Sequence, residues 1–141
     1  MCVILKQKLF SFQSPPEKTK QAILTAIRTG YRFIDCANDY DNEHIIGEAL
    51  KELFEEGVVN RSDLFIQAKL WNTNHRPEHV ELDLNATLKD LQLDYVDSYI
   101  IHWPTACPST GKNVTLRTNG SYLANYKESE LESVMLKIRL H

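Results

Sequence analysis

The sequence predicts an α/β fold in which short buried strands alternate with amphipathic helices around a parallel sheet. Three segments carry apolar residues at helical spacing, and each is followed by a short run rich in β-branched and aromatic residues. Glycines and polar clusters separate several of these segments. Regular alternation of this kind is typical of right-handed βαβ units.

The first predicted helix begins where two prolines follow a serine. Ser14 can cap the helix, Pro15 suits its first position, and Glu17 would complete a capping box. Gly30 stands where a left-handed residue would end the helix. A strand from Tyr31 to Cys36 is expected directly after it. The expected apolar face of this helix consists of Ala22, Ile23, Ala26 and Ile27.

Two further pairs of helix and strand follow. One helix begins near Glu43 and ends near Gly57, before a strand from Leu64 to Leu70. The next helix begins near Pro77, before a strand from Tyr95 to Ile101. The expected apolar faces are Ile46, Ala49, Leu50 and Leu53 in the first of these helices, and Val80, Leu84, Leu88 and Leu91 in the second.

Composition and charge restrict the classes of partner. Apolar residues make up 43% of the 141-residue chain and charged residues 25%, a balance typical of globular proteins. The formal charge of -3 provides no basic field, which argues against nucleic acid and against a membrane surface as partners. The three cysteines show no CxxC spacing, so we expect reduced thiols and a cytoplasmic protein.

An ionisable residue stands at the end of each of the three predicted strands. These residues are Asp35, Lys69 and His102, spaced 34 and 33 residues apart, which is close to the length of one βα unit. In a (β/α)8 barrel the carboxyl ends of the strands form one rim, and that rim carries the active site. A charged group at the end of a buried strand costs desolvation unless it has a partner or a task. We therefore expect a functional site at this rim.

Tyr40 adds a fourth functional group to the same rim. It follows Asp35 by five residues and can reach over the rim from the adjoining loop. A phenol is a weak acid at neutral pH, but a nearby ammonium such as that of Lys69 stabilises its phenolate. Asp35 would balance the charge of Lys69, and His102 could donate a hydrogen bond to a carbonyl oxygen. Together these groups describe a proton donor for carbonyl reduction.

Three sequence blocks resemble motifs of the aldo-keto reductase family. The first runs from Gly30 to Ala37 and continues through Tyr40 to the segment from Asn42 to Gly47. The second is Gln67 to Trp71, and the third is Asp97 to Pro104. Their order is that of the family, and Trp71 and Trp103 resemble its aldose reductase and aldehyde reductase-like branch. The resemblance implies a TIM barrel, of which this chain corresponds to roughly the first four βα units.

The resemblance also implies an activity and a cofactor. The family reduces aldehydes and ketones with NADPH, by hydride transfer combined with proton donation. By resemblance Tyr40 is the acid, Lys69 strengthens it, Asp35 pairs with Lys69, and His102 orients the carbonyl group. Asp35 would also contact the nicotinamide ribose of NADP(H).

A substrate pocket is implied in the same way. Trp71, His102 and Trp103 would bind the substrate, and the two tryptophans resemble the aromatic walls of the family's pocket. The implied substrate is a small carbonyl compound, such as a sugar, another aldehyde or a lipid-derived carbonyl. Taken alone, either tryptophan would more often belong to a hydrophobic core.

The resemblance suggests how the chain is organised. We expect one partial oxidoreductase domain over residues 1–141, with a family-like core at 14–104 and a polar loop and terminal helix at 105–141. In the segment before Ser14, Phe12 stands where the family has tryptophan, and the family's glycine-rich turn is absent. The expected apolar face of the terminal helix consists of Leu131, Val134, Met135 and Ile138.

Two alternatives to an active reductase remain open. Half a barrel leaves open sheet edges, so the chain could be a catalytically inactive fragment that associates with another barrel or with itself. Separately, His75 and His79 match the H-x-x-E-H pattern of some metalloproteases. We expect no metal site, because Pro77 suits a helix start and would leave His75 outside the helical turn that contains His79.

Overall fold

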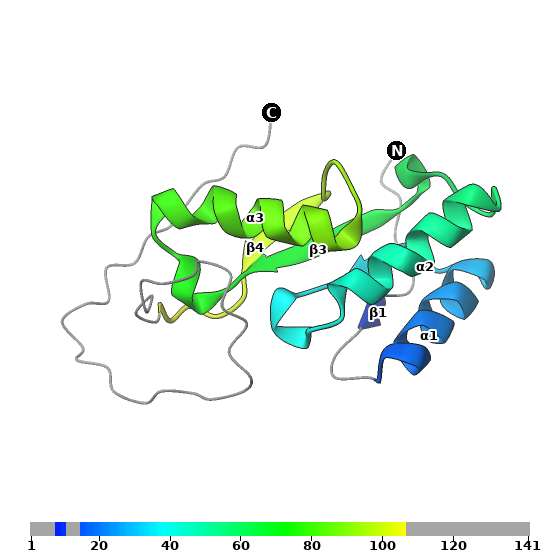
Figure 1. Ribbon diagram of the computed structural model, residues 1–141, viewed down its shortest axis with the longest axis horizontal. Coiled ribbons are helices and arrows are strands. Elements are labelled where there is room, and N and C mark those ends of the chain that lie inside the picture. Colours follow the sequence, from blue (N-terminus) through cyan, green and yellow to red (C-terminus); the bar gives the residue numbers. More distant parts are fainter. Residues whose placement is uncertain (1–7, 11–14, 107–141) are drawn as a thin grey trace.

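The computed structural model describes residues 8–10 and 15–106, which form a four-stranded parallel sheet with helices on one face (Figure 1). The strands are β1 (Lys8–Phe10), β2 (Phe33–Asp35), β3 (Phe65–Leu70) and β4 (Ser98–Ile101), and they neighbour one another in chain order. The helices are α1 (Pro16–Arg28), α2 (Glu43–Glu55) and α3 (Pro77–Leu91). Short 3-10 helices lie in the connections: η1 (Asn38–Tyr40), η2 (Arg61–Asp63) and η3 (Asn72–Asn74). The predicted alternation of helices and strands is confirmed.

The strands are shorter than the hydrophobic runs that predicted them. β2 has three residues, and β4 begins at Ser98 rather than at Tyr95. Tyr95 is 46% exposed and lies outside the sheet, where its ring contacts the guanidinium of Arg61 at 3.9 Å from the ring centroid. An aromatic residue can therefore extend a strand-like pattern without pairing in the sheet. β1 has only three residues, too few to give a strand pattern in the sequence.

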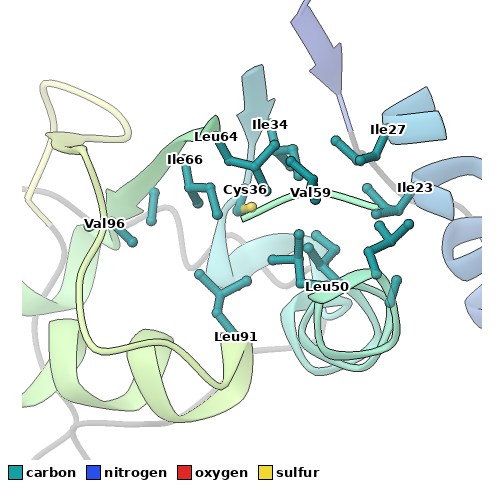
Figure 2. Packing of buried hydrophobic residues seen from close by; sticks show 14 of the residues in the cluster. Ile23, Ile27, Ile34, Cys36, Leu50, Val59, Leu64, Ile66, Leu91 and Val96 are labelled. Carbon is teal, nitrogen blue, oxygen red and sulfur yellow. The ribbon is translucent and has the colours of Figure 1, made fainter. Parts of the chain in front are cut away.

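The hydrophobic core lies between the sheet and the helices (Figure 2). Ile34 of β2 and Ile66 of β3 lie opposite Leu50 of α2 and Leu91 of α3, and all four side chains are fully buried. Burying a side chain of this size stabilises the fold by about 1.5–3 kcal/mol. The sheet is thus held by apolar contacts on the face that the helices cover.

The predicted apolar faces of α1 and α2 differ in their agreement with the structure. Every residue expected on the α2 face is buried. On α1 the residues expected at 23, 26 and 27 are buried, but Ala22 is exposed and Leu24 is buried instead. The inclusion of Ala22 was therefore wrong. Burying leucine removes more apolar surface from water than burying alanine, which favours Leu24 on the covered side.

The covered face of α3 is more polar than predicted. Val80 and Leu91 are buried as expected, whereas Leu84 and Leu88 are only partly buried. The buried positions between Val80 and Leu91 are instead Asp83 and Thr87, which are 3% and 1% exposed. Thr87 donates from its hydroxyl to the buried carboxylate of Glu43 on α2 at 3.1 Å, so hydrogen bonding offsets its desolvation.

The start of α1 also differs from the prediction. The helix begins at Pro16, with Pro15 in the capping position, and no side chain of the described residues caps it. The expectation that Pro15 takes the first helical position is therefore wrong, because the helix starts one residue later. Gly30 follows the last turn with φ +105°, a conformation that favours glycine, as predicted.

Gly47 allows α2 and α3 to approach closely. A Cβ atom at this position would collide with the backbone carbonyl oxygen of Asp90 and would lie 2.8 Å from the carbonyl carbon and oxygen of Leu91. Backbone atoms of a helix cannot rotate away from such a contact as a side chain can. The glycine is therefore required by the packing of α2 against α3.

Several sequence predictions lie outside the described residues. These include the capping role of Ser14, the residue at 12, and the terminal helix within 105–141. Within the described part of the chain, Cys36 is a free, fully buried cysteine. None of the helices described here has the length and apolar character needed to cross a membrane.

Candidate active site

The parallel register brings the ends of β2, β3 and β4 to one rim. Asp35 pairs with Gln67 in the sheet, and Lys69 lies two residues further along β3. His102 directly follows β4, and its backbone N–H donates to the carbonyl oxygen of Leu70 at 3.1 Å. This bond continues the pairing between β3 and β4 by one residue. Three chemically active side chains therefore lie at the same end of three adjacent strands.

Lys69 and Asp35 form a buried ion pair at this rim. The Lys69 Nζ lies 2.6 Å from Asp35 Oδ1, and the two side chains are 9% and 2% exposed. The side-chain amide of Gln67 also donates to Asp35 Oδ1, at 3.0 Å. Two charges at this depth are stable together because each offsets the desolvation of the other.

The ammonium of Lys69 also faces Tyr40. Lys69 Nζ donates to the hydroxyl oxygen of Tyr40 at 3.3 Å and to the backbone carbonyl oxygen of Cys36 at 3.0 Å. Tyr40 ends η1, and its backbone N–H donates to the carbonyl oxygen of Ala37 at 3.0 Å. Asp41 then takes a left-handed conformation with φ 50°, which aspartate tolerates better than most residues. The short turn thus directs the tyrosine back toward the end of β3.

Aromatic rings surround the imidazole of His102. Its centroid lies 5.4 Å from the Trp71 ring and 5.7 Å from the Tyr40 ring, both in edge-on geometry. Trp103 stacks on the imidazole at 5.9 Å and an interplanar angle of 16°, and this tryptophan is 51% exposed. His102 thus lies among three aromatic rings, and that of Trp103 is open to solvent. An aromatic surface of this kind can accept a small organic molecule.

The electrostatics of the rim favour a neutral imidazole. Burial lowers the pKa of His102 below its usual value, and the nearby ammonium of Lys69 lowers it further. The carboxylates of Asp39 and Asp35 act in the opposite direction but more weakly. The Nδ1 atom of His102 is buried and makes no hydrogen bond with the described residues.

One buried carboxylate at this rim was not anticipated from the sequence. Asp83 of α3 accepts hydrogen bonds from Asn38 and from the backbone N–H of Trp71, at 3.0 Å and 3.1 Å. It thereby joins the loop that contains Tyr40 to the loop that follows β3. A polar residue inside the expected apolar face of α3 was the one available indication.

The two histidines of the metalloprotease pattern are separated by the start of α3. His75 lies before the helix and His79 lies within it, as the position of Pro77 predicted. Among the described residues, no group of three or more histidine, cysteine, aspartate or glutamate side chains is arranged to hold a metal ion. The geometry at this position gives no support to a hydrolytic site.

A sequence model of the aldo/keto reductase family matches residues 8–124, which is most of the chain. The chain belongs to the aldo/keto reductase family. It is 54% identical over 99 residues to aldo-keto reductase family 1 member A1 of Mus musculus. That match covers 70% of this chain and 30% of the mouse protein.

Solved aldo-keto reductase structures agree with the described fold. The aldose reductase of Schistosoma japonicum matches with a TM-score of 0.71 and 44% identity, covering 76% of this chain and 35% of that protein. The Bombyx mori aldo-keto reductase in complex with NADP matches with a TM-score of 0.70 and 36% identity, covering 72% and 35%. The described sheet is therefore part of a TIM barrel, and the predicted fold class is confirmed. The chain spans about a third of the length of the relatives it matches.

Proposed function

We propose that this aldo-keto reductase chain contributes the proton-donating part of an active site that reduces aldehydes and ketones with NADPH. The observation that carries the proposal is the position of the Lys69 ammonium. It lies 2.6 Å from the Asp35 carboxylate and 3.3 Å from the Tyr40 hydroxyl oxygen. An ammonium at this distance can stabilise the negative charge that develops on the phenol oxygen while its proton is transferred.

Reduction of a carbonyl group requires a hydride at carbon and a proton at oxygen. NADPH, when bound, would supply the hydride. The hydroxyl of Tyr40 would supply the proton, so its O–H bond breaks while the O–H bond of the product alcohol forms. The phenolate left behind would be stabilised by Lys69, whose own charge is balanced by Asp35.

His102 is suited to orient the carbonyl group. Because burial and Lys69 lower its pKa, the imidazole is neutral at neutral pH and carries one N–H donor. A carbonyl oxygen that accepts this N–H would lie beside Tyr40, whose ring centroid is 5.7 Å from that of His102. Donation at the oxygen also polarises the carbonyl and makes its carbon easier to reduce.

Asp35 is the described residue that fits the nicotinamide end of the cofactor. Its carboxylate is an acceptor of the kind that a ribose hydroxyl requires, and Lys69 connects it to the proposed proton donor. We therefore assign to Asp35 both the pairing with Lys69 and a contact with the nicotinamide ribose of NADP(H). Substitution of Asp35 should then affect cofactor binding as well as turnover.

The aromatic surface supports a small carbonyl compound as substrate. Trp71 and Trp103 contact two sides of His102, so an apolar or sugar-like body could lie against them while its carbonyl faces His102. Flat rings accept many shapes of organic molecule, which favours a range of aldehydes over a single one. We propose sugars, other aldehydes and lipid-derived carbonyls as the substrate class.

Two measurements on the purified chain test this proposal. NADPH titration by fluorescence quenching should be saturable, and a generic aldehyde should be reduced. Tyr40→Phe should lower turnover about a hundredfold or more, because the proton donor is lost while packing changes little. Tyr31→Phe, outside the rim, should leave turnover unchanged. Lack of saturable NADPH binding would refute the proposal for this chain, and full activity of Tyr40→Phe would refute the assigned role of that residue.

The edge of β4 supports a second candidate function, association with another barrel fragment or another copy of the chain. Among the described strands β4 pairs only with β3, and its residues Ile100 and Ile101 are 42% and 37% exposed. An exposed apolar edge strand is a template for pairing with another chain. The occupant we propose is a second copy, since an identical edge can pair with itself.

Light scattering tests the second candidate directly. The chain should form dimers or larger species, and Ile101→Lys should shift them to monomers because a charge at the edge opposes pairing. Leu82→Lys is a matched control, since Leu82 is 50% exposed on α3 and away from the edge. A monomer at every concentration, or equal dissociation by both variants, would exclude pairing through β4.

A further inference from the structure

The carboxylate of Asp83 receives four hydrogen bonds, two on each oxygen. The side-chain amides of Asn38 and Asn74 donate to Oδ1 at 3.0 Å and 2.7 Å. The backbone N–H of Trp71 and the hydroxyl of Tyr99 donate to Oδ2 at 3.1 Å and 2.7 Å. An ionised carboxylate accepts hydrogen bonds and donates none, so this donor set fits it fully.

These donors come from the segments that carry the proposed active-site residues. Asn38 begins η1, the turn that ends in Tyr40. The Trp71 N–H belongs to a proposed wall of the substrate pocket, and Asn74 ends η3 in the same loop. Tyr99 lies on β4, three residues before His102. One side chain on α3 is thereby bonded to η1, to the loop that follows β3 and to β4.

Packing alone does not explain an aspartate at position 83, because burying its carboxylate costs desolvation. It is 3% exposed, and burial raises its pKa above the usual value although its four hydrogen bonds act in the opposite direction. An apolar residue on the covered face of α3 would avoid that desolvation. The hydrogen bonds are therefore better explained by what they hold in place than by the stability of the helix.

We propose that Asp83 is a positioning residue that fixes the loops bearing Tyr40 and Trp71 relative to each other. A role of Asp83 in catalysis rests on the proposed reductase function. Its effect on the positions of the two loops does not. Both oxygens are needed: asparagine at this position would keep one acceptor, and its amide N–H groups would face two of the existing donors. Asp83→Asn should therefore loosen the connection between the two loops, although asparagine has the same shape as aspartate.

Hydrogen–deuterium exchange on the full 141-residue chain tests the positioning role without requiring activity. In Asp83→Ala, backbone amides in 37–42 and 71–76 should exchange about tenfold faster or more, because charge-assisted hydrogen bonds to both loops are lost. Amides of α1 and α2 should be unaffected. Glu81→Ala, an exposed position on the same helix, is the matched control and should change neither loop.

Two further variants separate positioning from general destabilisation. Asn38→Ala should accelerate exchange in 37–42 alone, and Asn74→Ala should accelerate it in 71–76 alone, since each removes one loop's donor. They also keep the proposal testable if Asp83→Ala does not fold. Unchanged exchange in both loops, or a uniform increase that includes α1 and α2, would overturn it.

Kinetics then connect the loops to the proposed reaction. If the chain reduces an aldehyde, Asp83→Asn should lower kcat about tenfold or more, because the proton donor Tyr40 is displaced. The KM for NADPH should stay constant, because the proposed cofactor contact of Asp35 is not displaced. Unchanged kcat would overturn the catalytic part of the inference. A wild-type chain without reductase activity would count against the proposed function alone, and the exchange result would still decide the role of Asp83.

Discussion

The ammonium of Lys69 lies 2.6 Å from the carboxylate of Asp35, and both groups are almost completely buried. An ion pair at this depth contributes little net stability compared with apolar residues of the same size, because both charges lose their water. The presence of this pair at the ends of β2 and β3 is therefore better explained by a second contact of Lys69. Its ammonium faces the hydroxyl of Tyr40 at 3.3 Å.

Removing one member of this pair should be much more costly than removing both. Asp35→Asn leaves the Lys69 ammonium buried without its countercharge, so we expect the free energy of unfolding to fall by about 3 kcal/mol. Urea denaturation followed by circular dichroism measures the loss. The double variant Asp35→Asn with Lys69→Met should lose less than the sum of the two single variants, and strict additivity would show that the pair is not coupled.

The ion pair between the last residue of α1 and the residue that follows α2 should behave in the opposite way. Arg28 Nη2 lies 2.6 Å from Glu56 Oε2, the same separation as in the buried pair, but the side chains are 43% and 44% exposed. Water screens this pair, so Arg28→Ala should change the free energy of unfolding by less than about 1 kcal/mol. The measurement is urea denaturation at low and high salt. A loss comparable to that of Asp35→Asn would contradict the argument from exposure.

The sequence predicted those features that depend on periodicity and on strand ends. The residues of α2 that were expected to be buried are buried, because a helix in contact with a sheet must cover one apolar stripe. The spacing of Asp35, Lys69 and His102 predicted a shared rim, because parallel strands of similar length end at the same edge. Both inferences need only local pattern and topology.

The contacts that complete the site could not be predicted in this way. The donors to Asp83 come from positions 38, 71, 74 and 99, and no periodicity connects them. Lys69 also donates to the backbone carbonyl of Cys36, an atom that every residue type possesses. The polar character of Asp83 and Thr87 within the α3 face was visible in the sequence, but their partners were not.

The stability of the fold should decrease as the pH falls below about 6.5, the usual pKa of histidine. Burial lowers the pKa of both His102 and His75 in the folded chain, and Lys69 adds to the effect on His102. In the window between the lowered folded values and about 6.5, the unfolded chain binds more protons, so acid favours unfolding. Below the folded values the effect of pH on these groups levels off.

Urea midpoints measured across this range test the histidine assignment. His102→Gln and His75→Gln should each reduce the slope of stability against pH, because neither glutamine titrates. His44→Gln is the control, since His44 is exposed. An unchanged slope in the double variant of His75 and His102 would show that other groups cause the acid sensitivity.

Gly47→Ala should destabilise the chain even though alanine is the better helix former. Alanine in place of glycine within an exposed helix gains about 1 kcal/mol. Here the added Cβ would collide with the backbone of Asp90 and lie 2.8 Å from the carbonyl group of Leu91, so α2 and α3 must move apart. Overpacking of this kind costs about 1–3 kcal/mol, and the contact with rigid backbone places the cost at the upper end of that range.

The neighbouring residue provides the control for this substitution. Glu48→Ala changes an exposed position of the same helix and should leave the urea midpoint almost unchanged. In Gly47→Ala the midpoint should fall, and amides at the contact of α2 with α3 should exchange faster than those between α1 and α2. Equal or higher stability of Gly47→Ala would mean that the two helices can separate without loss, and the close approach at Gly47 would then not be required for this fold.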